Sequence, residues 1–308
     1  MADHERPESA PVKTAAQRRL RRGVFVVPSL LTTGNIFCGF YSVTESLLGA
    51  QALSLGDVGV ATEHFDRAAI NIGFAYLFDA LDGRIARMTG SATDFGVELD
   101  SIADVLSFGI APALLAFSWG YGAIPQLHKI GWAVSFLFLI CGALRLARFN
   151  VQARHPNPKQ FPNPKTEKKA FVGLPIPAGA TLIAAIVHFW PSPLYQGARL
   201  SIPSLGNIDG TMLGIGMIAL VTCLAFLMVS TLRYSSFKGA GARKYHPRVL
   251  FLAIALIGLS IWFYSRWSLL IMASLYGSSG ILAKLSSLFR PRKAKAERES
   301  ARTEPVRE

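Results

Sequence analysis

The feature that most constrains this chain is a series of long apolar segments spread along its length. We count about eight of them, each of roughly 18–23 residues, the length that a helix needs to cross about 30 Å of hydrocarbon. They lie near residues 28–50, 67–88, 97–119, 130–150, 172–190, 211–232, 248–265 and 268–288. A backbone inside a bilayer must satisfy its own hydrogen bonds, so these segments are predicted to be transmembrane helices.

The composition supports the same fold class. Hydrophobic residues make up 51% of the chain and charged residues only 17%, whereas a soluble domain carries about 25% charge. The apolar runs are continuous rather than alternating, which excludes a β-barrel pattern. We therefore expect an all-α, polytopic membrane helix bundle surrounded by membrane lipids. A polar turn around Ser265–Trp267 separates the last two segments, which could instead form one re-entrant or interfacial element.

Basic residues are distributed unevenly between the two ends of the predicted helices. If the N-terminus is cytoplasmic and the helices alternate, all but four of the 32 Lys and Arg residues lie at cytoplasmic ends. The exceptions are Arg67, Lys129, Arg199 and Arg266. The positive-inside rule then predicts a cytoplasmic N-terminus. The basic runs beside the first and last helices are explained as flanking charges on anionic lipid. No nucleic-acid partner is expected, because no aromatic-bearing soluble domain accompanies them.

The chain divides into four regions. We predict a cytoplasmic basic segment at 1–24, the main membrane domain at 25–240, an additional transmembrane helix pair at 241–289 and a charged tail at 290–308. The tail has too few apolar residues to form a core, so we expect it to be disordered.

Four aspartates occupy two consecutive predicted helices within the segment FDALDGRIARMTGSATDFGVELDSIADVLSFG, which begins at Phe78. Asp79 and Asp82 share one helix face, Asp100 and Asp104 share another, and a short turn would bring the two faces together. Each carboxylate costs about 2.5–3.5 kcal/mol at mid-bilayer, so the cluster is expected to bind cations. Ligands that are all oxygen suit Mg²⁺ or Mn²⁺.

Small residues accompany the acids. Gly83, Ala86 and Gly96 lie on the same faces and leave space for a bulky ligand, and Arg87 lies on nearly the same stripe. Helix packing would explain any one of these residues, but it needs no cluster of acids with only Arg84 and Arg87 between them. Carboxylates, space and a nearby cation together indicate a site for a metal-bound pyrophosphate.

The pattern D-x2-D-G-x2-A-R, eight residues, then G-x3-D-x3-D, resembles the signature of the CDP-alcohol phosphatidyltransferase family at every position. Five further segments resemble its phosphatidylserine synthase branch. They are PSLLTTGNIFCGF, LDSIADVLSFGIAPA, RLARFN, FVGLPIPAGA and MVSTLRYSSFKG. The likeness runs from about residue 28 to 239. It implies the six-helix core of the family, with about two extra C-terminal helices.

The resemblance implies a role for each acid. Asp79, Asp82 and Asp100 would hold one or two divalent cations, Mg²⁺ or Mn²⁺. Asp104 would be the catalytic base and a further metal ligand. The expected reaction transfers a phosphatidyl group from CDP-diacylglycerol to L-serine, giving phosphatidylserine and CMP.

Substrate-binding residues are also implied. Gly83, Arg87 and Thr93 would hold the nucleotide of the CDP-lipid. Thr32 and Asn35 could reach the cytidine, although hydrogen bonds between packed helices would explain them equally well. The L-serine carboxylate needs a cation, for which the candidates are Arg145 and Arg148, with ordinary flanking charge as the equal alternative.

Two alternative functions stay open. A sister enzyme could use glycerol 3-phosphate, inositol phosphate or another alcohol, because the signature does not specify the acceptor. An ion-coupled transporter is the alternative from another class. It is disfavoured because the acids lie at one interface, not at mid-membrane on broken helices. We expect a bacterial or archaeal cell membrane with the active site on the cytoplasmic side. A homodimer is compatible with the family.

Overall fold

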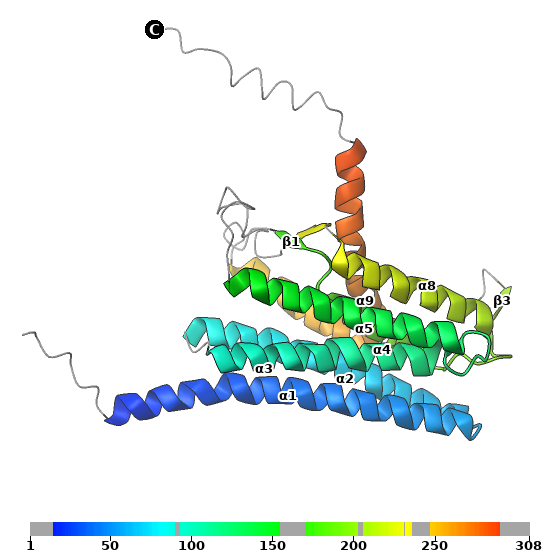
Figure 1. Ribbon diagram of the computed structural model, residues 1–308, viewed down its shortest axis with the longest axis horizontal. Helices are drawn as coiled ribbons and strands as arrows, with labels where there is room; N and C mark the ends of the chain where they lie inside the picture. Colours follow the sequence, from blue (N-terminus) through cyan, green and yellow to red (C-terminus); the bar gives the residue numbers. More distant parts are fainter. Residues whose placement is uncertain are drawn as a thin grey trace, which may run out of the picture.

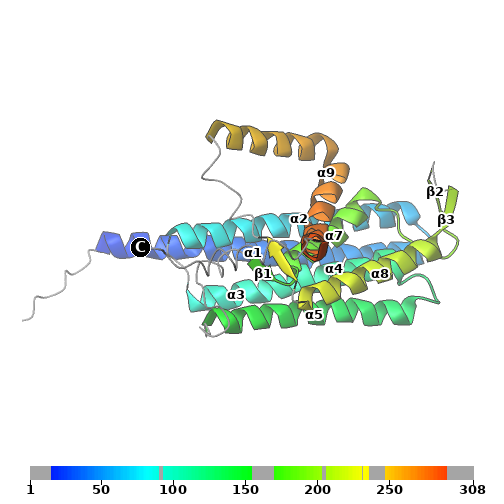
Figure 2. The same ribbon diagram turned by 90° about the horizontal axis from the view of Figure 1, so that it is seen from above.

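The computed structural model describes residues 15–89, 93–154, 170–202, 206–230, 232–235 and 247–289. Within these ranges the protein is a bundle whose main helices run along one common axis (Figures 1 and 2). This confirms the all-α prediction. The predicted C-terminal tail and the first 14 residues lie outside the described residues, so their properties stay predictions.

The described part of the chain contains six helical rods and a bent C-terminal helix. They are α1 (Ala15–Ser54), α2 (Val58–Thr89), the rod made of α3 (Asp94–Asp104), η1 (Val105–Ile110), α4 (Ala111–Ala116) and η2 (Phe117–Tyr121), then α5 (His128–Arg154), α7 (Ile176–Phe189), α8 (Gly210–Val229) and α9 (Pro247–Phe289). Apart from a few end residues, every predicted apolar segment lies in one of these helices.

Three rods are long and apolar enough to cross a membrane by length and composition. They span Asp94–Tyr121, His128–Gln152 and Gly210–Val229, and α7 is apolar but shorter. Helix α2 is long, at 32 residues, yet it carries acidic and basic side chains along its length. Charged side chains do not favour insertion into lipid, so those on α2 must have another role.

Short strands occur in two of the connections. β1 (Ala170–Val172) pairs with β4 (Arg233–Ser235), and β2 (Arg199–Ile202) pairs with β3 (Gly206–Asp209), both antiparallel. Gly173 follows β1 at φ +80°, and a Cβ there would collide with the Met228 carbonyl. The turn into α7 therefore requires glycine. The apolar pattern gave no sign of these strands, which are too short to change the fold class.

Helices α1 and α2 pack closely because small residues line their contact. Ala61, Ala68 and Ala75 of α2 are fully buried. A Cβ on Gly49 of α1 would lie 2.9 Å from the Phe65 ring. Small residues let helix backbones approach each other in a membrane. The close contact brings the first half of α1 beside the end of α2, where the acidic residues lie.

The rod that starts at Asp94 is not a uniform α-helix. Its η1 and η2 segments have π-helical turns, which the sequence pattern did not predict. Pro112 lies near the start of α4 and has no N–H to donate to the preceding turn. A wider turn accommodates such a break, and π-helical turns are frequent at functional sites. The first π turn begins immediately after Asp104.

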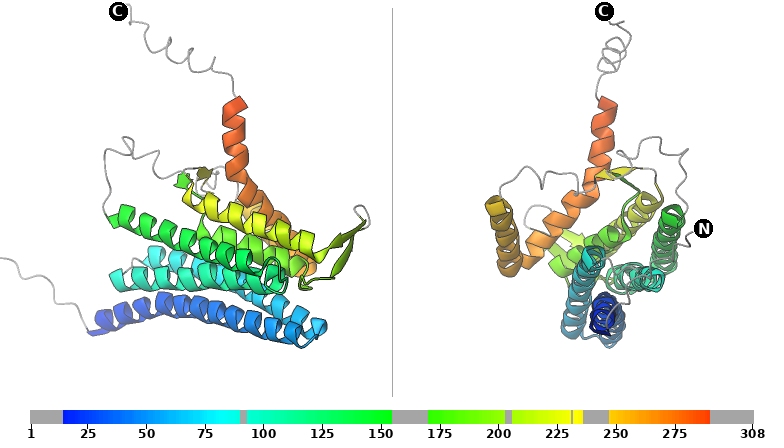
Figure 3. Two further views of the ribbon diagram at one scale, coloured as in Figure 1. Left: turned by 45° about the vertical axis from the view of Figure 1, so that its right-hand side comes forward. Right: turned by 90° about the vertical axis from the view of Figure 1, so that its left-hand side faces the viewer.

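The C-terminal segment α9 consists of two helical halves that meet at a kink, close to the polar turn expected at Ser265–Trp267; that these halves cross the membrane stays a prediction. The two halves meet at Tyr264, whose φ of −135° and ψ of 47° are not helical. Beside this bend, the Ser268 hydroxyl donates to the Ser260 carbonyl at 3.0 Å. The half after the bend crosses the bundle and projects past α8 (Figure 3). A side-chain hydroxyl that bonds a backbone carbonyl helps to satisfy the backbone where the helical pattern is interrupted.

Candidate active site

Three of the predicted acidic residues meet where α2 and α3 adjoin. One carboxylate oxygen from each of Asp79, Asp82 and Asp100 lies within 4.8 Å of the other two. Asp82 is only 4% exposed. Carboxylates this close repel one another, and the repulsion is stronger where water is excluded. All-oxygen ligands at this spacing fit a bound divalent cation.

The local sequence explains why the two acidic faces meet. α2 ends at Thr89 and α3 begins at Asp94, so only a short connection separates them. Thr93 caps α3, because its hydroxyl accepts a hydrogen bond from the Gly96 N–H at 3.0 Å. Such a cap stabilises the start of a helix by about 1 kcal/mol. Thr93 therefore has a structural role, and its predicted contact with the nucleotide stays a prediction.

Asp104 lies one turn beyond Asp100 and, among the described residues, is not in the group of carboxylates within 4.8 Å. It interacts electrostatically with the three acids and with Arg145. One oxygen of Asp104 and one of Asp100 are buried without a hydrogen-bond partner. A buried carboxylate oxygen without a donor is destabilising. These two oxygens therefore fit a cation or a substrate group.

Helix α1 contributes two polar side chains. The Thr32 hydroxyl donates to the Asp82 carboxylate at 2.8 Å. Asn35 is fully buried, and neither its Oδ1 nor its Nδ2 has a partner. The backbone carbonyl of Asn35 accepts a hydrogen bond from the Ser107 hydroxyl at 3.0 Å. Thr32 thus orients an acid of the cluster, and the Asn35 amide has both a donor and an acceptor to offer a ligand. Contact with cytidine stays a prediction for both.

Arg87 lies against the face of α2 that carries Gly83. A Cβ on Gly83 would be 3.4 Å from an Arg87 guanidinium nitrogen. Arg87 is also close enough to interact electrostatically with Asp79, Asp82 and Asp100. A guanidinium beside carboxylates can bind a phosphate whose remaining charge a cation neutralises. The absence of a side chain at Gly83 leaves room for this arrangement.

Helix α5 brings only one of its two predicted arginines to the cluster. Arg145 is half-buried and interacts with Asp104, and its Nε is buried without a partner. Arg148 is exposed, with no contact to the acids in the part of the chain that the structure describes. The Asn150 amide donates to the Ser101 hydroxyl at 2.7 Å and so connects α5 to α3. Of the two candidates, Arg145 lies beside Asp104, and acceptor binding by Arg145 and Arg148 stays a prediction.

One neighbour of the site was missed in the sequence. Tyr276, on the half of α9 after the bend, interacts electrostatically with Arg145 and Tyr76. It also packs against the hydrophobic core. Tyr276 belongs to no motif, and its approach depends on the path of α9 across the bundle. No spacing pattern could have indicated it.

Known proteins resemble this chain over the same region. The sequence profile described as CDP-alcohol phosphatidyltransferase matches residues 25–229. A Helicobacter pylori protein named CDP-diacylglycerol–serine O-phosphatidyltransferase is 33% identical over 222 residues, covering 70% of this chain and 74% of that protein. A Bacillus subtilis protein of the same name is 30% identical over 215 residues, covering 69% and 91%.

A third relative matches a shorter stretch of this chain, at a higher identity. A Methanocaldococcus jannaschii protein, also named CDP-diacylglycerol–serine O-phosphatidyltransferase, is 44% identical over 112 residues, covering 36% of this chain and 46% of that protein. The profile match includes all of the clustered aspartates and ends before α9. With the signature complete and the profile covering most of the membrane bundle, the chain belongs to the CDP-alcohol phosphatidyltransferase family.

Proposed function

We propose that this protein transfers a phosphatidyl group from CDP-diacylglycerol to L-serine, releasing CMP and forming phosphatidylserine, with the help of a divalent cation. The observation that carries the proposal is the group formed by Asp79, Asp82 and Asp100, whose oxygens lie within 4.8 Å of one another. The names of the relatives support L-serine as the acceptor. Mg²⁺ and Mn²⁺ are the ions that suit such a ligand set.

The chemistry requires charge neutralisation around a diphosphate. A divalent cation bound by the carboxylates would neutralise the pyrophosphate and stabilise the departing CMP. Thr32 holds Asp82 in its orientation through the 2.8 Å hydrogen bond. Arg87, which lies over Gly83, adds positive charge for the phosphate oxygens. The buried Asn35 amide offers hydrogen bonds to the nucleotide.

Asp104 is suited to the role of base, with a second role as cation ligand. It lies beyond the three-acid group and interacts with Arg145, where a serine carboxylate would pair with the guanidinium. The serine hydroxyl attacks the phosphorus that carries the diacylglycerol. An oxygen–phosphorus bond forms, the pyrophosphate bond to CMP breaks, and the hydroxyl proton passes to Asp104. Positioning supplies much of the rate in such transfers.

The location of the reaction follows from the lipid substrate. The acyl chains of CDP-diacylglycerol lie in the bilayer, so the diphosphate is at an interface. The excess of Lys and Arg at one end of the helices supports a cytoplasmic active site. The Asp79–Asp104 segment belongs to that basic end.

One assay determines both which acceptor the protein uses and whether it needs a divalent cation. Purified protein receives CDP-diacylglycerol with labelled L-serine or labelled glycerol 3-phosphate, in Mg²⁺, Mn²⁺ or EDTA. Lipid products are separated by thin-layer chromatography, and CMP is quantified. We expect phosphatidylserine from L-serine alone, loss of turnover in EDTA and recovery on adding the cation. Exclusive use of glycerol 3-phosphate would overturn the acceptor, and turnover unaffected by EDTA would overturn the cation.

A further inference from the structure

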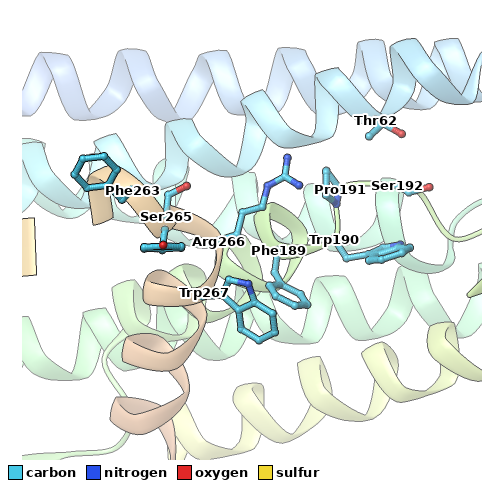
Figure 4. Close-up of a pocket in the computed structure, with 10 residues that line it drawn as sticks. Thr62, Phe189, Trp190, Pro191, Ser192, Phe263, Ser265, Arg266 and Trp267 are labelled. Carbon is cyan, nitrogen blue, oxygen red and sulfur yellow. The ribbon is translucent and has the colours of Figure 1, made fainter. Parts of the chain in front are cut away.

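A second polar site lies far from the acidic cluster, between the start of α2, the end of α7 and the bend of α9. A cavity of about 580 Å³ opens there, and Thr62, Trp190, Ser192, Arg266 and Trp267 are among the residues that line it (Figure 4). Thr62 precedes Asp79 by 17 positions on the same helix. At 1.5 Å per residue the two lie about 25 Å apart. The cavity is therefore separate from the proposed active site.

A hydrogen-bonded chain of side chains holds the bend of α9 at this cavity. His188, at the end of α7, contacts the Asp66 carboxylate of α2 through Nδ1 at 2.6 Å and the Ser265 hydroxyl through Nε2 at 3.0 Å. His188 is only 7% exposed. Trp267 packs edge-to-face on Phe189, with ring centroids 4.7 Å apart. These contacts fix the residues that follow the bend against the family core.

Arg266 supplies a positive charge at this cavity. Its guanidinium extends into the cavity toward α2 (Figure 4). Among the described residues it has no ion pair or hydrogen bond, whereas Arg67 nearby on α2 pairs with Glu63 at 2.9 Å. A guanidinium binds phosphate oxygens through two parallel hydrogen bonds. The Ser192 hydroxyl also lines the cavity and can add a further bond.

The walls of the cavity suit an amphipathic ligand. Trp190, Tyr264 and Trp267 line it and are 42%, 68% and 58% exposed. Trp and Tyr concentrate at the membrane–water interface, where an arginine head also reaches the polar layer. A free inorganic anion would gain nothing from these aromatic walls. A phosphate attached to acyl chains would contact both the charge and the walls.

We propose that this cavity binds the headgroup phosphate of a bilayer phospholipid from the leaflet opposite the acidic cluster. Arg266 contacts the phosphate, and Trp190 and Trp267 pack against the glycerol and the first acyl carbons. This lipid is not the substrate, because the acidic cluster lies at the other end of α2. The inference does not depend on the proposed reaction, and its test uses no enzymatic readout.

The experiment compares Arg266→Gln with Arg67→Gln in the full-length protein, stripped of lipid in detergent. Arg67 is the matched control, since it lies at the same end of the bundle but is already paired. Native mass spectrometry then measures binding of dioleoyl phosphatidylglycerol. We expect the wild type and Arg67→Gln to bind one lipid equally, and Arg266→Gln to bind it about tenfold more weakly. Diacylglycerol, which has no phosphate, should bind the wild type and Arg266→Gln alike.

Two results would overturn the proposal. Equal phosphatidylglycerol affinity of wild type and Arg266→Gln would show that Arg266 does not bind the phosphate. Full displacement of the lipid by millimolar inorganic phosphate would identify a small-anion site. If Arg266→Gln does not fold, a second experiment is used. It measures how a phospholipid brominated near the glycerol quenches the tryptophan fluorescence of the protein. Saturable quenching in the wild type that is lost in Trp190→Phe/Trp267→Phe is expected, and its absence in the wild type would refute the site.

Discussion

The two ends of α2 use acidic side chains in opposite ways. Near its start, Asp66 contacts His188 at 2.6 Å, and the neighbouring His64 contacts Glu45 of α1 at 2.7 Å. Near its end, Asp79 and Asp82 face each other and Asp100 within 4.8 Å. The helix is the same in both regions. What differs is whether each carboxylate directly contacts a basic side chain or only lies near one, as the clustered acids lie near Arg87.

The difference separates a structural use of carboxylates from a binding use. An acid with a histidine partner is already satisfied and stabilises the contact between helices. At the other end of the helix, one buried oxygen of Asp100 and one of the neighbouring Asp104 have no hydrogen-bond partner. This is unfavourable in the protein alone. Proteins retain such locally unfavourable arrangements where a ligand needs them. Substitutions at the two ends of α2 should therefore have different consequences.

The largest effect is expected for Asp104→Asn. The amide cannot accept the proton of the acceptor hydroxyl, so CMP release should fall about a thousandfold. The three-acid group stays complete, so Mn²⁺ measured by electron paramagnetic resonance should still bind. Turnover at the wild-type rate would remove Asp104 as the base.

Asp79→Asn should lower CMP release about a hundredfold through weaker cation binding. Raising the Mn²⁺ concentration should restore part of the rate, which a titration of turnover against Mn²⁺ would measure. Asp66→Asn is the matched control on the same helix and should keep the wild-type Mn²⁺ dependence. If both variants need more Mn²⁺, the distinction between the two ends of α2 fails.

Asn35→Leu should raise the KM for CDP-diacylglycerol about tenfold, because the buried amide would no longer bind the nucleotide. The same change removes a polar group that has no partner in the protein, so the free energy of unfolding should rise by about 1 kcal/mol. Kinetics and thermal melting measure the two effects. Asn71→Leu, at an asparagine whose amide bonds the Arg67 carbonyl at 2.8 Å, should leave the KM unchanged. A stability loss at Asn35 with unchanged KM would indicate a packing role.

Asp66→Asn should have the smallest effect on catalysis. Weakening the contact with His188 should lower the free energy of unfolding by about 2 kcal/mol, seen as a lower melting temperature in detergent. The rate of CMP release per folded molecule should stay within about twofold of wild type. A severe loss of turnover at an unchanged melting temperature would contradict the structural role of the paired acids.

Much of the architecture could be predicted from local patterns. Apolar length indicates helices because a backbone in lipid has few other ways to satisfy its hydrogen bonds. The spacing of Asp79, Asp82 and Asp100 indicates shared faces because successive helical residues rotate by a constant angle. The short connection from Thr89 to Asp94 makes those faces adjoin. None of these inferences requires a contact between distant parts of the chain.

Other features depend on the packing of helices around one another. The direction in which α9 turns at Tyr264 depends on contacts such as the hydrogen bond from Ser268 to the Ser260 carbonyl. Arg145 rather than Arg148 interacts with Asp104 because of the rotation of α5. His188 and Asp66 are 122 positions apart in the chain. The sequence by itself determined that the chain would form membrane helices with an acidic face. Only the tertiary structure decided which acids were paired and which were left to bind a ligand, because helix rotation and long-range contacts leave no periodic trace in the residue order.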